Sequence, residues 1–152
     1  MNFIPAHSDL LWSPAVRMSN DDRLMHQQTF KELHDLNIKV GGVGIAFPQV
    51  GLHMAAFISR YEGWPVCVNP EFRIVGLDRI SRLEGCLSRP GWHTYVNRPA
   101  KVYAMWDDVD GFSKTKLLDG IESRVFQHLC DLLKGQPIFP RPSPPKRHAS
   151  HV

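Results

Sequence analysis

Residues 124–135 read "RVFQHLCDLLKG", and this stretch decides the fold because it predicts a long buried helix. Around it, apolar residues recur at steps of three or four positions, which gives a helix one continuous apolar face. These residues are Leu118, Ile121, Val125, Leu129 and Leu132. We expect the helix to begin at about Leu117 or Gly120, to run to Lys134 and to stop at Gly135.

The segments before this helix predict short strands and one further helix. The stretches "HMAAFISR" (53–60), "WPVCVNPEFRIVG" (64–76) and "KVYAMWDD" (101–108) are rich in Val, Ile and aromatic residues, which is typical of strands. Residues 19–38 predict a helix that Ser19 or Asn20 can cap. Its apolar stripe would be formed by Leu24, Phe30, Leu33 and Leu36.

The remaining segments predict connections. The stretch "GGVGIAFPQVG" (41–51) indicates a loop or tight turn, "EGCLSRPGWHTYVNR" (84–98) lies between strands, and "DVDGF" (108–112) indicates a turn. Strands flanking one long buried helix predict an α+β domain. We expect a single domain over residues 1–140, followed by a flexible, proline-rich and basic tail over residues 141–152.

The composition is that of one globular domain. A chain of 152 residues suffices for one core, and its net charge of +3 is too mild to argue for nucleic acid. The first residues lack the pattern of a signal peptide, and no apolar run reaches the roughly 18 residues that a membrane span needs. Three cysteines do not suggest a disulfide set, so we expect a reduced, cytoplasmic setting.

His128 raises the question of a metal site on the predicted helix. Two histidines four residues apart can grip one ion, because such positions differ by only about 40° around the helix axis. The residue four positions after His128 is Leu132, and a lone histidine on an apolar face is more often a core residue than a ligand. Cys86 alone is likewise more often a small buried side chain. Asp131 could offer an oxygen ligand, but a salt-bridged helix residue is the simpler interpretation.

Three separate stretches together resemble the signature motifs of the peptide deformylase family. The stretch "GVGIAFPQVG" (42–51) resembles the glycine-rich first motif, and "EGCLS" (84–88) matches the second motif at every position. The stretch "QHLCDL" (127–132) aligns with the third, whose family form is Gln-His-Glu-x-Asp-His. The resemblance covers roughly residues 5–140 and implies antiparallel strands wrapped around a central buried helix.

The resemblance also implies residue roles. Cys86 and His128 would hold a divalent ion, which is Fe(II) in the family or alternatively Zn or Ni. Gln49 and the backbone N–H of Leu87 would stabilise the oxyanion that forms when the formyl group of an N-formylmethionyl peptide is hydrolysed. The remaining residues placed around the bound peptide are Gly44, Ile45, Gly85, His93 and Val125. Arg98 and Asp131 are candidates for a supporting ion pair or for two solvated charges.

Two leucines depart from the family pattern. Leu129 stands where the family has its catalytic glutamate, and Leu132 stands where it has its second histidine ligand. Leucine has no lone pair and no titratable proton, so we expect weak or absent metal binding and impaired catalysis. His53, His93 and Asp131 are the candidates for completing the site. Because two leucines remove polar groups from the core, we also expect the domain to fold without metal.

Three functions are therefore compared. The first is a peptide deformylase that acts on nascent chains at the ribosome and is impaired by these leucines. The second is a non-catalytic binder of formyl-methionyl peptides, which the two leucines favour for this chain. The third is contact with RNA through the basic tail "RPSPPKRHASH" (141–151), which has no aromatic residue for stacking on bases. A solvated tail without specific nucleic-acid binding is the simpler interpretation, and we expect no membrane partner.

Overall fold

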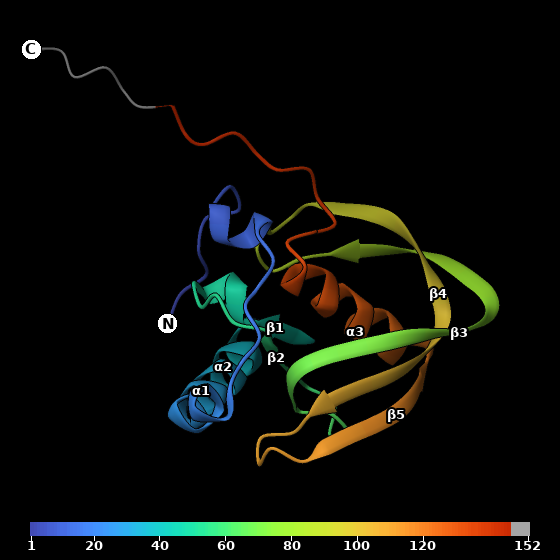
Figure 1. The fold of residues 1–152 in the computed structure, drawn as a ribbon. Coiled ribbons are helices and arrows are strands. Elements are labelled where there is room, and N and C mark those ends of the chain that lie inside the picture. The colour runs from blue at the N-terminus through green and yellow to red at the C-terminus, as the bar shows by residue number, and fades with distance from the viewer. Residues whose placement is uncertain (147–152) are drawn as a thin grey trace, which may run out of the picture.

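The computed structural model describes residues 1–146 and has one antiparallel sheet that curves around a buried helix, α3 (Gly120–Leu133). The strands follow the order β1-β2-β3-β4-β5, so each strand pairs with its neighbours in sequence. Figure 1 shows α3 enclosed by the strands, with the helices α1 and α2 on one side. The bounds of the strands are β1 Gly44–Ala46, β2 Ala56–Ser59, β3 Val66–Gly85, β4 His93–Asp107 and β5 Ser113–Asp119. This arrangement confirms the α+β prediction.

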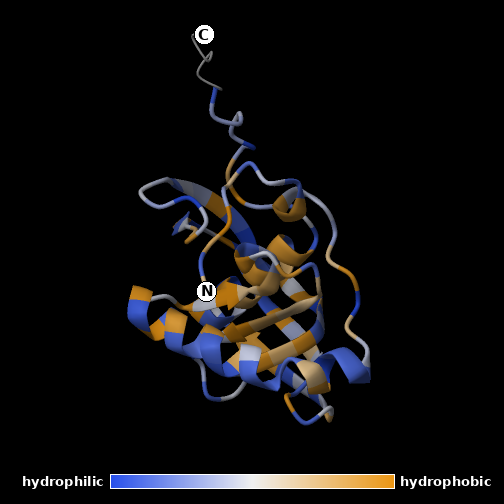
Figure 2. Ribbon diagram, turned by 90° about the vertical axis from the view of Figure 1, so that its left-hand side faces the viewer, coloured by the Kyte–Doolittle hydropathy of each residue, from blue (hydrophilic) through white to orange (hydrophobic). Residues whose placement is uncertain are grey.

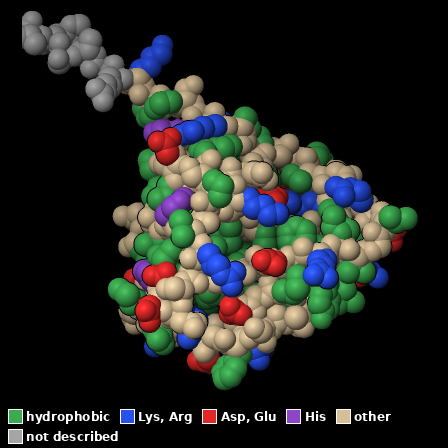
Figure 3. Space-filling view, viewed as in Figure 1, with side chains coloured by type: hydrophobic (Ala, Val, Ile, Leu, Met, Phe, Trp, Pro, Cys, Tyr) green, Lys and Arg blue, Asp and Glu red, His purple; other side chains and the backbone are tan. Residues whose placement is uncertain are grey.

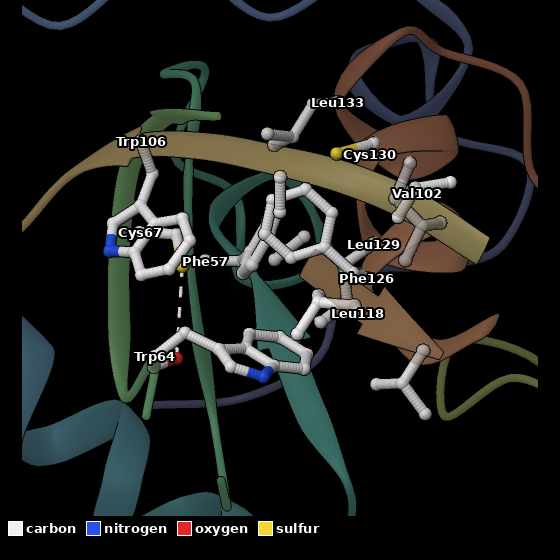
Figure 4. Close-up of a cluster of buried hydrophobic side chains, with 14 residues drawn as sticks. Phe57, Trp64, Cys67, Val102, Trp106, Leu118, Phe126, Leu129, Cys130 and Leu133 are labelled. Atoms are coloured by element: carbon white, nitrogen blue, oxygen red, sulfur yellow. Dashed lines mark hydrogen bonds between the residues drawn. The ribbon is translucent and has the colours of Figure 1, made fainter. Parts of the chain in front are cut away.

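The apolar face of α3 forms the centre of the core (Figure 4). The ring of Phe126 packs edge-on against Phe57 and Trp64, with centroid distances of 5.3 and 5.2 Å. The helix begins at Gly120, after Asp119 caps it, and Gly135 follows its end with a φ of 72°. The predicted helix is therefore confirmed with its start at Gly120, but two of the five residues assigned to its apolar face are wrong. Leu118 is buried but lies in strand β5, and Ile121 is 60% exposed.

The helix predicted over residues 19–38 is two helices, α1 (Asn20–Met25) and α2 (Gln27–Val40). The Ser19 side chain caps α1 as predicted, through a reciprocal pair of hydrogen bonds with Asp22. His26 interrupts the helix because its backbone ends α1 and begins α2. Leu24 is 60% exposed, so the apolar stripe is wrong at that residue. Figure 2 shows hydrophobic and hydrophilic residues mixed along α2 and hydrophobic residues dominating the central strands.

The glycine-rich stretch 41–51, predicted to be a loop or tight turn, contains a strand and a short helix. Strand β1 pairs with β2, with Gly44 opposite Ser59, and the 3₁₀ helix η2 spans Phe47–Val50. Pairing is possible because glycine brings the backbone close to its neighbours: a Cβ added at Gly44 would lie 2.8 Å from the carbonyl oxygen of Ile58. The close approach of the backbone at Gly44 to Ile58 therefore decides the local structure, and the spacing of apolar residues in the sequence does not reveal it.

The strands after β2 are longer than predicted. Strands β3 and β4 form a long hairpin whose register shifts between Val75 and Arg79, where Gly76 has a φ of 74°. The stretch 84–98 is a connection only over residues 86–92, because both of its flanks continue the hairpin. Strand β5 was not predicted, since its residues alternate too weakly. The turn at 108–112 is confirmed, with the Asp108 carboxylate accepting hydrogen bonds from two backbone N–H groups.

The end of the described chain runs across the surface. Residues 141–146 form no helix or strand, and the predicted tail beyond them, residues 147–152, lies outside the described residues. Within residues 1–146, no helix is both long and apolar enough to cross a membrane. On the face seen in Figure 3, basic side chains are interspersed with acidic and apolar ones. The division of the chain after residue 140 stays a prediction.

Candidate functional site

A cavity of about 520 Å³ lies between β1, the connection 86–92 and α3. Most of its walls are apolar, and its polar atoms come from a few side chains that converge at one end. The predicted site residues that line it are Gly44, Gln49, Gly85, Cys86, Leu87, His93, Val125, His128 and Leu129. Ile45 does not line it, because this side chain is fully buried in the core. The structure thus brings nearly all of the predicted residues to one place.

Gln49 is held in a fixed orientation at the polar end of the cavity. Its side-chain oxygen accepts a hydrogen bond from the backbone N–H of Ala46 at 2.9 Å. Its amide nitrogen then points at the connection 86–92, where it donates to Ser88 Oγ at 3.0 Å and to Cys86 Sγ at 3.7 Å. An amide donor fixed in this way can polarise a carbonyl oxygen bound beside Cys86.

Glu84, which itself lines the cavity, holds a cluster of charged groups together. Arg98 donates to both carboxylate oxygens, at 2.6 and 2.9 Å, and Arg124 donates a third hydrogen bond at 2.5 Å. His128 completes this set, with its Nδ1 atom 3.0 Å from Glu84 Oε1. Burial would raise the pKa of Glu84, but hydrogen bonds from His128 and Arg98 outweigh it and lower the pKa to about 2.

The contact with Glu84 also shifts the pKa of His128. Burial would lower the pKa of this imidazole, but hydrogen bonds to Cys86 and Glu84 raise it to about 9. Arg98 also pairs with Asp131 at 2.7 Å, so the candidate ion pair is formed.

Arg124, which donates a hydrogen bond to Glu84, is a residue of this cluster that the sequence did not predict. The signal in the sequence was only a charged residue within the apolar helix.

The two leucines are packed in the apolar core. Leu129 and Leu132 are each 1% exposed and belong to the cluster around Phe126. Leu129 also lines the cavity and presses against β1, because a Cβ added at Gly44 would lie 2.7 Å from its Cδ1 atom. Neither position therefore offers a polar atom to the cavity.

The other candidates do not complete a metal site. His93 lines the cavity with its ring over Gly85, whereas Asp131 is held by Arg98 and His53 does not line the cavity. Within residues 1–146, no group of three or more His, Cys, Asp or Glu side chains could hold a metal ion. Cys86 and His128 are two donors, and structural or catalytic sites for such ions use three or four protein ligands. These residues do not fit a resident metal ion.

Comparison with known proteins identifies the family of this chain. The sequence model of the polypeptide deformylase family matches residues 2–148. The chain belongs to the peptide deformylase family. A peptide deformylase of Thermotoga petrophila is 34% identical over 84% of this chain and 77% of its own length.

Solved structures of deformylases have the same fold. The structure of peptide deformylase from Thermotoga maritima matches with a TM-score of 0.84 and 27% identity, over 94% of this chain and 97% of that one. A deformylase of Synechococcus elongatus in complex with actinonin matches with a TM-score of 0.81 and 33% identity, over 89% of this chain and 74% of that one. Deformylases are metal-dependent hydrolases of formylated peptides. The departures of Leu129 and Leu132 from the family pattern stay a prediction.

Proposed function

We propose that this chain binds N-formylmethionyl peptides in the cavity and does not hydrolyse them efficiently. The observation that carries the proposal is the burial of Leu129 and Leu132 in the apolar core beside an otherwise retained cavity. Without a proton acceptor at position 129, a positioned acid or base that typically contributes ~10²–10⁴ in rate is missing. The chain is then a deformylase-family protein whose catalytic groups are impaired.

Several features support retained peptide binding. The cavity has apolar walls, from residues such as Val125 and Leu129, that suit an unbranched methionine side chain. Strand β1 is the edge of the sheet, and within residues 1–146 no strand pairs with its second edge. An extended peptide can add there by backbone hydrogen bonds. The amide of Gln49 is placed to donate to a formyl oxygen bound near Cys86.

Any metal ion would be held by Cys86 and His128 alone. Whether iron, zinc or nickel is offered, losing one ligand removes several kcal/mol of the roughly 10–16 kcal/mol that a full set provides for zinc. We therefore expect weak binding. The peptides concerned would be the N-termini of nascent chains at the ribosome, in the cytoplasm, as the family membership suggests.

The test measures metal content, binding and turnover on one anaerobic preparation. Formyl-Met-Ala-Ser is titrated by calorimetry, beside Met-Ala-Ser without the formyl group and formyl-Asp-Ala-Ser with a charged first side chain. We expect the first peptide to bind more tightly than both controls and to remain uncleaved. A Leu129→Glu, Leu132→His double variant should bind about one metal ion and turn the peptide over.

Two results would contradict the proposal. Stoichiometric metal together with rapid cleavage by the natural chain would mean that other residues complete the site. Equal affinity for the three peptides, or no binding, would mean that the cavity no longer recognises formylated methionine.

A further inference from the structure

The connection 86–92 forms the outer wall of the cavity and has little regular structure of its own. Two turn hydrogen bonds stabilise it, from the N–H of Arg89 to the carbonyl of Cys86 at 3.0 Å and from the N–H of Trp92 to the carbonyl of Arg89 at 3.3 Å. Trp92 lines the cavity on one side of this wall. A short connection of this kind needs support from outside to keep one conformation.

That support comes from residues 136–141, the strap, which follows α3 and crosses the back of the wall. Phe139 is only 2% exposed, although both of its neighbouring residues are less buried. Its ring lies between two tryptophans, with centroid distances of 5.7 Å to Trp12 and 6.1 Å to Trp92, and both contacts are edge-on. Such pairs contribute about 0.5–1.5 kcal/mol beyond the burial of area.

Arginines join the strap to its neighbours on both sides. Arg89 lies over the rings of Trp92 and Phe139, at 5.5 and 5.7 Å, and donates to the carbonyl of Pro140 at 3.2 Å. On the other side, Arg141 donates to the carbonyl of His7 at 2.8 Å and pairs with Asp9. The wall, the strap and the 3₁₀ helix η1 (Asp9–Trp12) therefore form one connected cluster. Figure 1 shows the chain after α3 passing beside η1.

We infer that the strap fixes the wall of the cavity and that Phe139 is a positioning residue for ligand binding, acting through Trp92. The effect on ligand affinity rests on the proposed function, whereas the effect on the wall does not. Without the phenyl ring, Trp92 and Arg89 lose the surface against which they pack. The wall then samples open conformations, and a peptide must select the closed one.

The test uses the full chain with Phe139→Ala and compares it with Trp106→Ala. Trp106 is also buried, at 5% exposure, but it packs on Phe126 at the opposite end of β4 from Trp92. Amide hydrogen exchange of residues 87–92, measured without ligand, should be about tenfold faster in Phe139→Ala than in Trp106→Ala. The affinity for formyl-Met-Ala-Ser should fall by about tenfold, and by less when Trp92→Ala is already present.

Each outcome decides the inference. Exchange of residues 87–92 that is no faster in Phe139→Ala than in Trp106→Ala would overturn it. If Phe139→Ala does not fold, Phe139→Leu keeps most of the apolar volume, and its exchange over the same residues is judged against the same control. Should the natural chain bind no peptide, the proposed function fails, while the exchange measurement still decides whether the strap holds the wall.

Discussion

Restoring the family residues at positions 129 and 132 should make the protein less stable without metal. Both leucines are 1% exposed. Removing a fully buried leucine from the core loses about 1.5–3 kcal/mol of burial free energy, and leaving a buried polar group unpaired costs about 1–3 kcal/mol more. The two positions share one cluster, so the terms do not add in full. We expect the Leu129→Glu, Leu132→His variant to lose at least about 4 kcal/mol of unfolding free energy.

The assay is urea unfolding followed by circular dichroism, with chelator or with zinc. Zinc at a hundredfold excess over its dissociation constant should return about 2.7 kcal/mol to the double variant. The natural chain should unfold at the same urea concentration in both conditions. The matched control is Leu133→His, since Leu133 is a buried neighbour on the same helix that is not at a ligand position. It should be destabilised without recovery in zinc.

One result would refute this reasoning. If the double variant in chelator is as stable as the natural chain, Leu129 and Leu132 do not stabilise the core. A large loss of stability of the natural chain on adding chelator would equally refute it, because the fold would then depend on a bound metal.

Four further predictions concern the charged network and a helix cap. Arg98→Ala should lower the unfolding free energy by about 3–5 kcal/mol in urea titrations, because Glu84 and Asp131 lose a shared partner. With its pKa lowered from 4.5 to about 2, Glu84 should stabilise the fold above pH 4.5 and lose this contribution as the pH falls towards 2; Glu84→Gln should remove that dependence. His128, with its pKa raised from 6.5 to about 9, should stabilise the fold below pH 6.5 and lose this contribution as the pH rises towards 9, which unfolding curves of His128→Gln would test. Ser19→Ala should cost about 0.5–2 kcal/mol in thermal unfolding, through loss of the cap.

The parts of the fold that could be predicted are those with a repeated pattern. The apolar periodicity of α3 is carried by side chains that all meet the same core, so spacing alone locates the helix. His26 could not be predicted as an interruption, because no glycine or proline marks it in the sequence and only its backbone, with φ −102° and ψ 15°, departs from the helix. Ile121 has the right spacing for the buried face, yet it lies in the first turn of the helix and faces the cavity.

The residues of the site were predicted from short motifs and not from the spacing of apolar residues. The positions of Cys86, Gln49 and His128 followed from motifs, and the structure places all three at one cavity. The partners of Glu84 did not follow, because Arg98 and Arg124 come from separate elements that only the folded hairpin and α3 bring together. Long-range pairing of this kind leaves no local pattern in a single sequence.

The three cysteines differ in exposure to solvent, so a thiol reagent can label the cavity selectively. Cys67 and Cys130 are 0% and 3% exposed, and burial raises the pKa of both thiols, which makes them slow to react. Cys86 is partly exposed and lines the cavity. A fluorophore or spin label attached through a thiol-reactive group would therefore be placed at one known atom, without any cysteine having to be removed first. The unmodified sequence thus supplies its own attachment point for an optical or magnetic reporter beside the cavity.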